Sequence, residues 1–173
     1  MSAIPIRRHA IRLRPKAARV IVRPFIPATA PRIATVIGRA LALTEQEVEE
    51  ELQTLRAEFG SRHFDLEAVL LEQYARVQPH VFTQRPLSHA RQLLIGALFS
   101  GEYAVESAAL FNPSIVPHPD QRGVPDGSLR FVMSLRATGE GHISSIEFRV
   151  GLISADGEVS LTPASGLVTM PKV

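Results

Sequence analysis

The sequence predicts an α+β fold, with a helical region over residues 1–110 followed by antiparallel strands over residues 111–173. Apolar residues recur at helical spacing in several segments before residue 110. After residue 128, apolar and polar residues alternate with the period of two that is typical of strands. The stretch 112–127 between these regions is rich in proline and glycine, so we expect no regular element there.

The N-terminal segment combines basic and apolar residues. In residues 6–25 the two kinds nearly alternate, which predicts one or two short extended segments that are broken at Pro15 and ended by Pro24 and Pro27. Residues 1–43 contain nine Lys and Arg residues and no Asp or Glu. This basic arm could bind nucleic acid or another polyanion through phosphates, or it could be a solvated face or pair with acidic residues elsewhere in the chain or in a partner. The alternation and the lack of an aromatic stacking platform favour the interpretations other than polyanion binding.

Four helices are expected next. The first covers residues 30–42, with Pro31 suited to its first turn. The second has the strongest signal, because Thr44 and Glu47 form a capping box and Gly60 supplies an end. Its apolar stripe consists of Val48, Leu52, Leu55 and Phe59.

The third helix is predicted over residues 61–77, and Pro79 ends it. The fourth begins near Ser88, a plausible N-cap, and runs through Phe99. Residues 102–110 are also interpreted as helical, against the strand preference of Tyr103 and Val105.

The C-terminal part predicts three strands. Residues 129–136 and 142–153 alternate regularly, and the short link 137–141 joins them as an antiparallel hairpin. A third strand, 159–161, follows the turn at Asp156 and Gly157. Three strands are barely enough for a stable sheet, and exposed sheet edges favour pairing with a second chain.

Composition excludes several classes of function. The absence of cysteine removes disulfides, thiolate metal sites and a cysteine nucleophile. We find no nucleotide-binding glycine loop or hydrolase motif, and the six histidines lie at no metal-ligand spacing, so the sequence predicts no metal and no cofactor. No signal peptide and no apolar run of membrane-spanning length is present, which predicts a soluble, cytoplasmic protein with no membrane partner.

Polar residues around the predicted hairpin are candidates for a binding site. Arg136 ends a strand, and Glu140, His142 and Ser144 surround the link that follows. Asn112 precedes a proline, which favours extended backbone and an amide that both donates and accepts, as a sugar hydroxyl requires. The alternatives are a solvated hairpin tip and a simple turn initiator.

The run from Glu106 to Gly157 (ESAALFNPSIV…SLRATGEG…ISADG) resembles a signature of glycoside hydrolase family 130, and the segments RRHAIRLRP, VIVRPFIP and SRHFDLE are similar to its longer members. The resemblance implies a five-bladed β-propeller with a helical N-terminal extension. It also implies action on β-mannosides, either by hydrolysis or by inverting phosphorolysis to mannose 1-phosphate with inorganic phosphate as co-substrate.

By the same resemblance, Asn112 in FNPS and Arg136 in SLRA correspond to residues of the mannose site. The family places its general-acid Asp and its phosphate-binding basic residues in later blades. No match to either occurs here, so no catalytic residue is assigned. We therefore expect an N-terminal fragment with the first blade of an incomplete propeller, inactive alone. The alternatives are a non-catalytic module that forms homo-oligomers or binds a partner, and a polyanion-binding protein.

Overall fold

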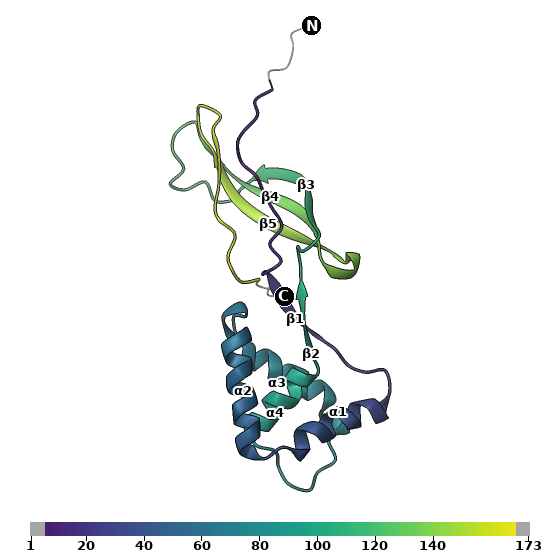
Figure 1. The fold of residues 1–173 in the computed structure, drawn as a ribbon. Helices are drawn as coiled ribbons and strands as arrows, with labels where there is room; N and C mark the ends of the chain where they lie inside the picture. The colour runs from purple at the N-terminus through teal and green to yellow at the C-terminus, as the bar shows by residue number, and fades with distance from the viewer. Residues whose placement is uncertain (1–5, 169–173) are drawn as a thin grey trace. The chain divides into compact units, whose positions relative to one another are not determined.

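The computed structural model describes residues 6–168, and these fall into two compact units (Figure 1). The β unit contains residues 104–165 together with the N-terminal segment up to Ala17. The helical unit contains residues 18–103 and the described residues from Gly166. Helices and antiparallel sheets are segregated along the chain, which confirms the α+β class.

The helical unit contains four α-helices and a two-stranded sheet. Its elements are β1 (Val20–Pro24), α1 (Ala30–Ala42), α2 (Glu45–Phe59), η1 (Gly60–Arg62), α3 (Leu66–Val77), η2 (Gln78–His80), α4 (His89–Leu98) and β2 (Ser100–Ala104), of which the last residue, Ala104, belongs to the β unit. The predicted third helix starts later than expected, because Asp65 caps it through the backbone N–H of Ala68 at 3.1 Å. The predicted helix over 102–110 is wrong, because this part of the chain pairs as β2 with β1 and then turns.

The capping box of α2 is present as predicted. The backbone N–H of Glu47 donates to the Thr44 hydroxyl at 3.2 Å, and the backbone N–H of Thr44 donates to the Glu47 carboxylate at 2.7 Å. The backbone N–H of Thr44, together with the Thr44 hydroxyl that also donates to this carboxylate at 2.8 Å, holds the Glu47 pKa below its usual value. The helix therefore begins where the sequence placed its N-terminus.

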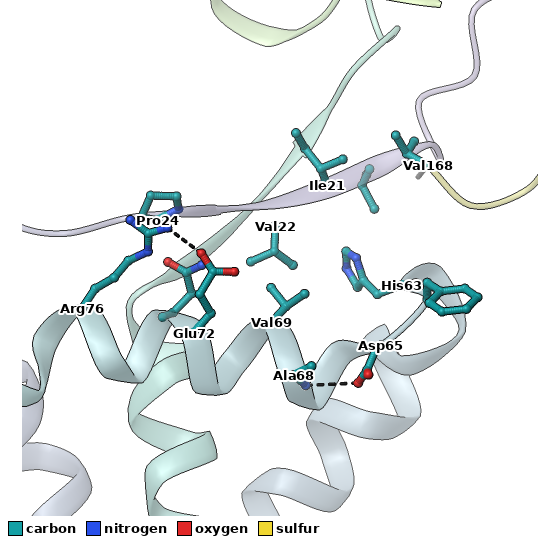
Figure 2. Close-up of a pocket in the computed structure, with 13 residues that line it drawn as sticks. Ile21, Val22, Pro24, His63, Asp65, Ala68, Val69, Glu72, Arg76 and Val168 are labelled. Carbon is teal, nitrogen blue, oxygen red and sulfur yellow. Dashed lines mark hydrogen bonds and ion pairs between the residues drawn. The ribbon is translucent and has the colours of Figure 1, made fainter. Parts of the chain in front are cut away.

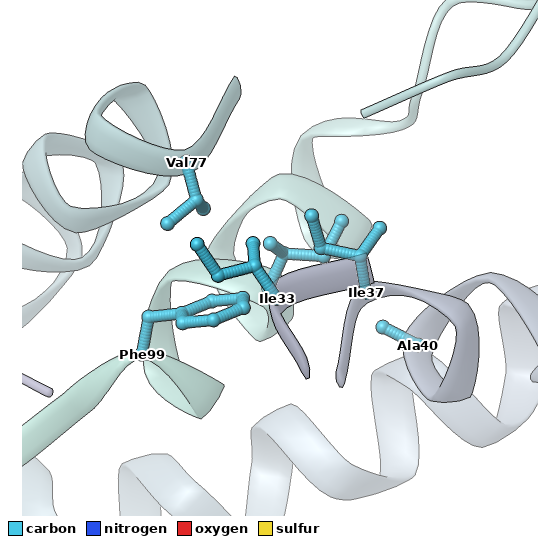
Figure 3. Packing of buried hydrophobic residues seen from close by; sticks show 6 residues of the cluster. Ile33, Ile37, Ala40, Val77 and Phe99 are labelled. Atoms are coloured by element: carbon cyan, nitrogen blue, oxygen red, sulfur yellow. The ribbon is translucent and has the colours of Figure 1, made fainter. Parts of the chain in front are cut away.

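Two apolar clusters form the core of the helical unit. In the first, side chains of α1 meet Val77 at the end of α3 and Phe99 just after α4 (Figure 3). In the second, Val48 and Leu52 of the predicted α2 stripe pack with side chains of α3 and α4. Gly96 allows α4 to approach α3 closely, because a Cβ at this position would lie 1.9 Å from the carbonyl oxygen of Leu70.

The β unit contains a four-stranded antiparallel sheet in the order β3-β4-β5-β6. Its elements are β3 (Ala109–Pro117), β4 (Leu129–Thr138), η3 (Glu140–His142), β5 (Ser144–Ile153) and β6 (Val159–Leu161). The hairpin and the short last strand are confirmed. The expectation of no regular element over 112–127 is wrong at its start, since β3 tolerates Pro113 at an irregularity of an edge strand and Pro117 at its end.

The core of the β unit lies on one face of this sheet. Phe131, Met133 and Leu135 of β4 are buried there, and Leu13 of the N-terminal segment packs against them. Residues 6–16 form no strand, so the prediction of a strand in the basic arm holds only for β1. This segment instead supplies cover for the sheet. None of the helices within residues 6–168 has the length and apolar character needed to cross a bilayer.

Candidate functional site

The pairing of β3 with β4 is interrupted next to Asn112. The register shifts between Phe111 and Ser114, and Asn112 has a backbone φ of 52°. Among residues 6–168, only Asn112 and His142 combine a positive φ with a side chain larger than glycine. Such backbone is unfavourable and, with β-bulges, is enriched at functional sites, where it re-aims a side chain. Asn112 is exposed at this irregularity.

Arg136 lies on the neighbouring strand β4, next to this irregularity, and its side chain makes two contacts. It pairs in register with Phe111, and its guanidinium carbon lies 5.4 Å from the centre of the Phe111 ring. Its Nε donates a hydrogen bond of 3.0 Å to the Ser144 hydroxyl on β5. These two contacts partly immobilise the Arg136 side chain, which is exposed. The other guanidinium nitrogens take no part in the bond to Ser144. We call Phe111, Asn112, Arg136 and Ser144 the bulge surface.

The other two predicted residues, Glu140 and His142, lie in η3 at the tip of the β4–β5 hairpin. Gly141 and His142 both have a positive φ there, and the backbone N–H of Gly139 donates to the carbonyl of Ile143 at 3.0 Å. Both predicted side chains are exposed. In the part of the chain that the structure describes, no hydrogen bond or ion pair joins either of them to the bulge surface. The structure thus brings together three of the five predicted residues.

An apolar area continues from the bulge surface along the same face of the sheet. Ile146 and Phe148 of β5 are 60% and 64% exposed, and Val116 of β3 is 56% exposed. Val116 pairs with Val132, and Val132 pairs with Val150, so all these side chains share one face. We call Val116, Val132, Ile146, Phe148 and Val150 the open face. Sequence reasoning missed its exposure, as it missed the role of Phe111.

The opposite side of β5 carries a buried charge cluster. Arg149 donates to Glu147 at 3.0 Å and to Glu106, whose side chain is fully buried, at 3.3 Å. In register, Glu147 and Arg149 lie beside the apolar Leu135 and Met133 of β4. This cluster explains why the apolar residues of β5 face outward. It also means that both carboxylates are held in ion pairs inside the unit.

The loop that leads from β3 to β4 is held by polar contacts. The Gln121 side chain donates to the carbonyls of His118 and Arg130 at 2.6 and 2.8 Å. Asp120 accepts from Nε and Nη2 of Arg122, both at 2.9 Å. These bonds from Arg122, with smaller contributions from the charges of Arg130 and His118, lower the pKa of Asp120 to about 2.

The basic arm is partly paired with acidic and aromatic groups. Arg7 forms an ion pair with Glu158, and the His9 ring lies 3.7 Å from the same carboxylate. The guanidinium of Arg23 lies 5.2 Å from the centre of the Tyr103 ring. Other members of the arm, Arg12, Arg14 and Lys16, line an open pocket of about 320 Å³ in the β unit.

No protein-family model matches this chain, and no curated protein or solved structure matches it closely enough to count as a relative. Within residues 6–168, no group of three or more His, Asp or Glu side chains is placed to hold a metal ion.

Proposed function

We propose that the β unit carries part of a sugar-binding site of an enzyme that acts on β-mannosides. The observation that carries the proposal is the bulge surface, where Arg136 is held by Phe111 and Ser144 beside Asn112 in left-handed backbone. The Asn112 amide and the Arg136 guanidinium offer several donors and one acceptor to neighbouring sugar hydroxyls. The half-buried ring of Phe111, next to the Arg136 guanidinium, suits the apolar side of a sugar.

The fold is consistent with the propeller that the resemblance implies. A four-stranded antiparallel sheet in sequential order is the unit from which propeller blades are built. We infer that this sheet is the first blade and that the helical unit is the N-terminal extension. The open face is then a surface that the rest of the enzyme covers.

We further propose that this chain binds but does not cleave. Inverting cleavage needs a carboxylic acid aligned on the glycosidic oxygen. Glu106 and Glu147 are buried in ion pairs with Arg149, and Glu140 lies at the hairpin tip without a contact to Arg136. The general acid and the phosphate-binding groups would be supplied by later blades of a longer polypeptide.

The first test is an activity and binding assay on the purified chain. Incubation with a β-linked mannobiose and inorganic phosphate should give no mannose and no mannose 1-phosphate. Calorimetry should detect weak mannobiose binding that is lost in Asn112→Ala and Arg136→Ala. The exposed Arg56→Ala, in the helical unit, is the control that keeps binding. Mannose 1-phosphate from wild type, or equal binding by all variants, would contradict the proposal.

Self-association is a second candidate function, and the open face favours it. Monomeric proteins rarely expose a contiguous apolar area of this kind, and apolar sheet faces stack readily on one another. Sedimentation velocity should show a concentration-dependent dimer that disappears in the double variant Ile146→Ser, Phe148→Ser. Phe82→Ser is a matched control, because Phe82 is 83% exposed in the helical unit. A wild-type chain that remains monomeric at high concentration would remove this candidate.

A further inference from the structure

A pocket of about 580 Å³ lies in the helical unit, between β1 and α3 (Figure 2). Val22 of β1 points toward Val69 of α3 across it, and Ile21 lies farther along the same strand. Phe64, which is 84% exposed, also lines it. Its volume and mainly apolar lining are those of a site for a small molecule.

The charged side chains that line this pocket already have partners. Asp65 accepts from the backbone N–H of Ala68 at 3.1 Å, and Glu72 lies 2.6 Å from Arg76. His63 shares a hydrogen bond of 2.7 Å with Glu102. A charged ligand would have to break these contacts, so the pocket suits a neutral one.

Gln73 adds a polar group that lacks a partner. It lies on the pocket side of α3, is only 3% exposed, and its Oε1 has no hydrogen-bond partner among residues 6–168. Buried side-chain oxygens are nearly always satisfied, and each exception calls for an explanation. A carbonyl oxygen of this kind can only accept, so its missing partner is a donor.

We propose that this pocket binds a neutral, mainly apolar small molecule that donates one N–H or O–H to Oε1 of Gln73. The apolar body of the ligand lies between Val22 and Val69. The site lies in the helical unit and shares no residue with the bulge surface, so this proposal stands or falls independently of the sugar site.

The test uses N-phenyl-1-naphthylamine, a neutral apolar fluorophore with one N–H donor. Its fluorescence should rise saturably with wild-type protein. Gln73→Leu should weaken binding roughly five- to tenfold, the effect of losing one hydrogen bond. The N-methylated probe, which has no donor, should bind wild type and Gln73→Leu equally.

Two bulky substitutions locate the site. Ala68→Phe and Val69→Trp should both abolish saturable binding, because each fills the pocket from α3. Ala75→Phe, an exposed position on the same helix outside the pocket, should bind like wild type. Circular dichroism checks folding, and amide shifts induced by the probe should concentrate at Val22, Val69 and Gln73. No saturable binding by wild type, unchanged binding by both bulky variants, or amide shifts elsewhere would overturn the proposal.

Discussion

Arg91 lies on α4 and is 7% exposed, with its guanidinium directed at the end of α1 and the start of α2. It donates to the carbonyl oxygens of Ala40 and Leu43, and its Nη2 lies 2.6 Å from the Glu45 carboxylate. Ser88 donates to the same carboxylate, and these bonds hold the Glu45 pKa below its ordinary value. One side chain thus satisfies backbone acceptors at a helix end.

Replacing Arg91 should destabilise the helical unit. We expect Arg91→Ala to lower the free energy of unfolding by about 2–3 kcal/mol, because buried carbonyl oxygens lose charged donors. Arg76→Ala, which breaks an exposed pair with Glu72, should change it by less than about 1 kcal/mol. Urea titrations measure both values, and equal effects would contradict the role given to Arg91.

The pKa of Asp120 gives a second test. The pKa of Asp120 is lowered to about 2 in the folded chain, so the ionised carboxylate stabilises the fold at pH values above its ordinary pKa of 3.8. That contribution is lost as the pH falls from about 4 toward 2. Side-chain NMR should give a midpoint near 2, and Arg122→Ala should move it back toward 3.8. A wild-type midpoint near 3.8 would show that the ion pair does not form in solution.

The contact between α3 and α4 depends on the absence of a side chain at Gly96. A Cβ there would collide with the backbone of Leu70, and backbone atoms cannot shift aside as the end of a flexible side chain can. Gly96→Ala should therefore destabilise the protein by about 1–3 kcal/mol, although alanine is the better helix former. Gly38→Ala on α1 meets no atom within 4 Å and should be stabilising by up to about 1 kcal/mol. Thermal unfolding of the two variants tests whether their stabilities change in opposite directions.

The helices could be predicted because their signals are local. Thr44 and Ser88 cap α2 and α4 through bonds to residues three positions later, so the sequence alone contains both partners. The strands β2 and β3 could not be found in this way. Their hydrogen bonds go to β1 and β4, and such pairing can override local preference, even next to Pro113.

The candidate site was only partly visible in the sequence for the same reason. The hairpin brought Arg136 and Ser144 together as the alternation predicted. The contact with Phe111 depends on the register of β3, a strand that was not expected. The alternation in β5 did not reveal that the face with Glu147 and Arg149 is the buried one, because that burial depends on the distant Glu106 and its ion pair with Arg149.

Taken as a whole, the chain places the bulge surface and the open face on the same side of one sheet, while the apolar pocket belongs to the helical unit. On the core face of the sheet, Leu13 of the N-terminal segment and side chains of the sheet itself pack against Phe131, Met133 and Leu135. On the other face, Val116, Ile146 and Phe148 remain exposed. A ligand at Arg136 would lie next to Ile146, its register partner.

The measurement that tests the sugar-site proposal most directly is an NMR titration of the chain with a β-linked mannobiose. We predict saturable shifts of the Phe111, Asn112 and Ser144 amides and of the Arg136 side chain, and their loss in Arg136→Ala. Amides of the helical unit should not move. If none of these signals shifts at millimolar sugar, or if the shifts are unchanged in Arg136→Ala, the bulge surface is not a mannoside site.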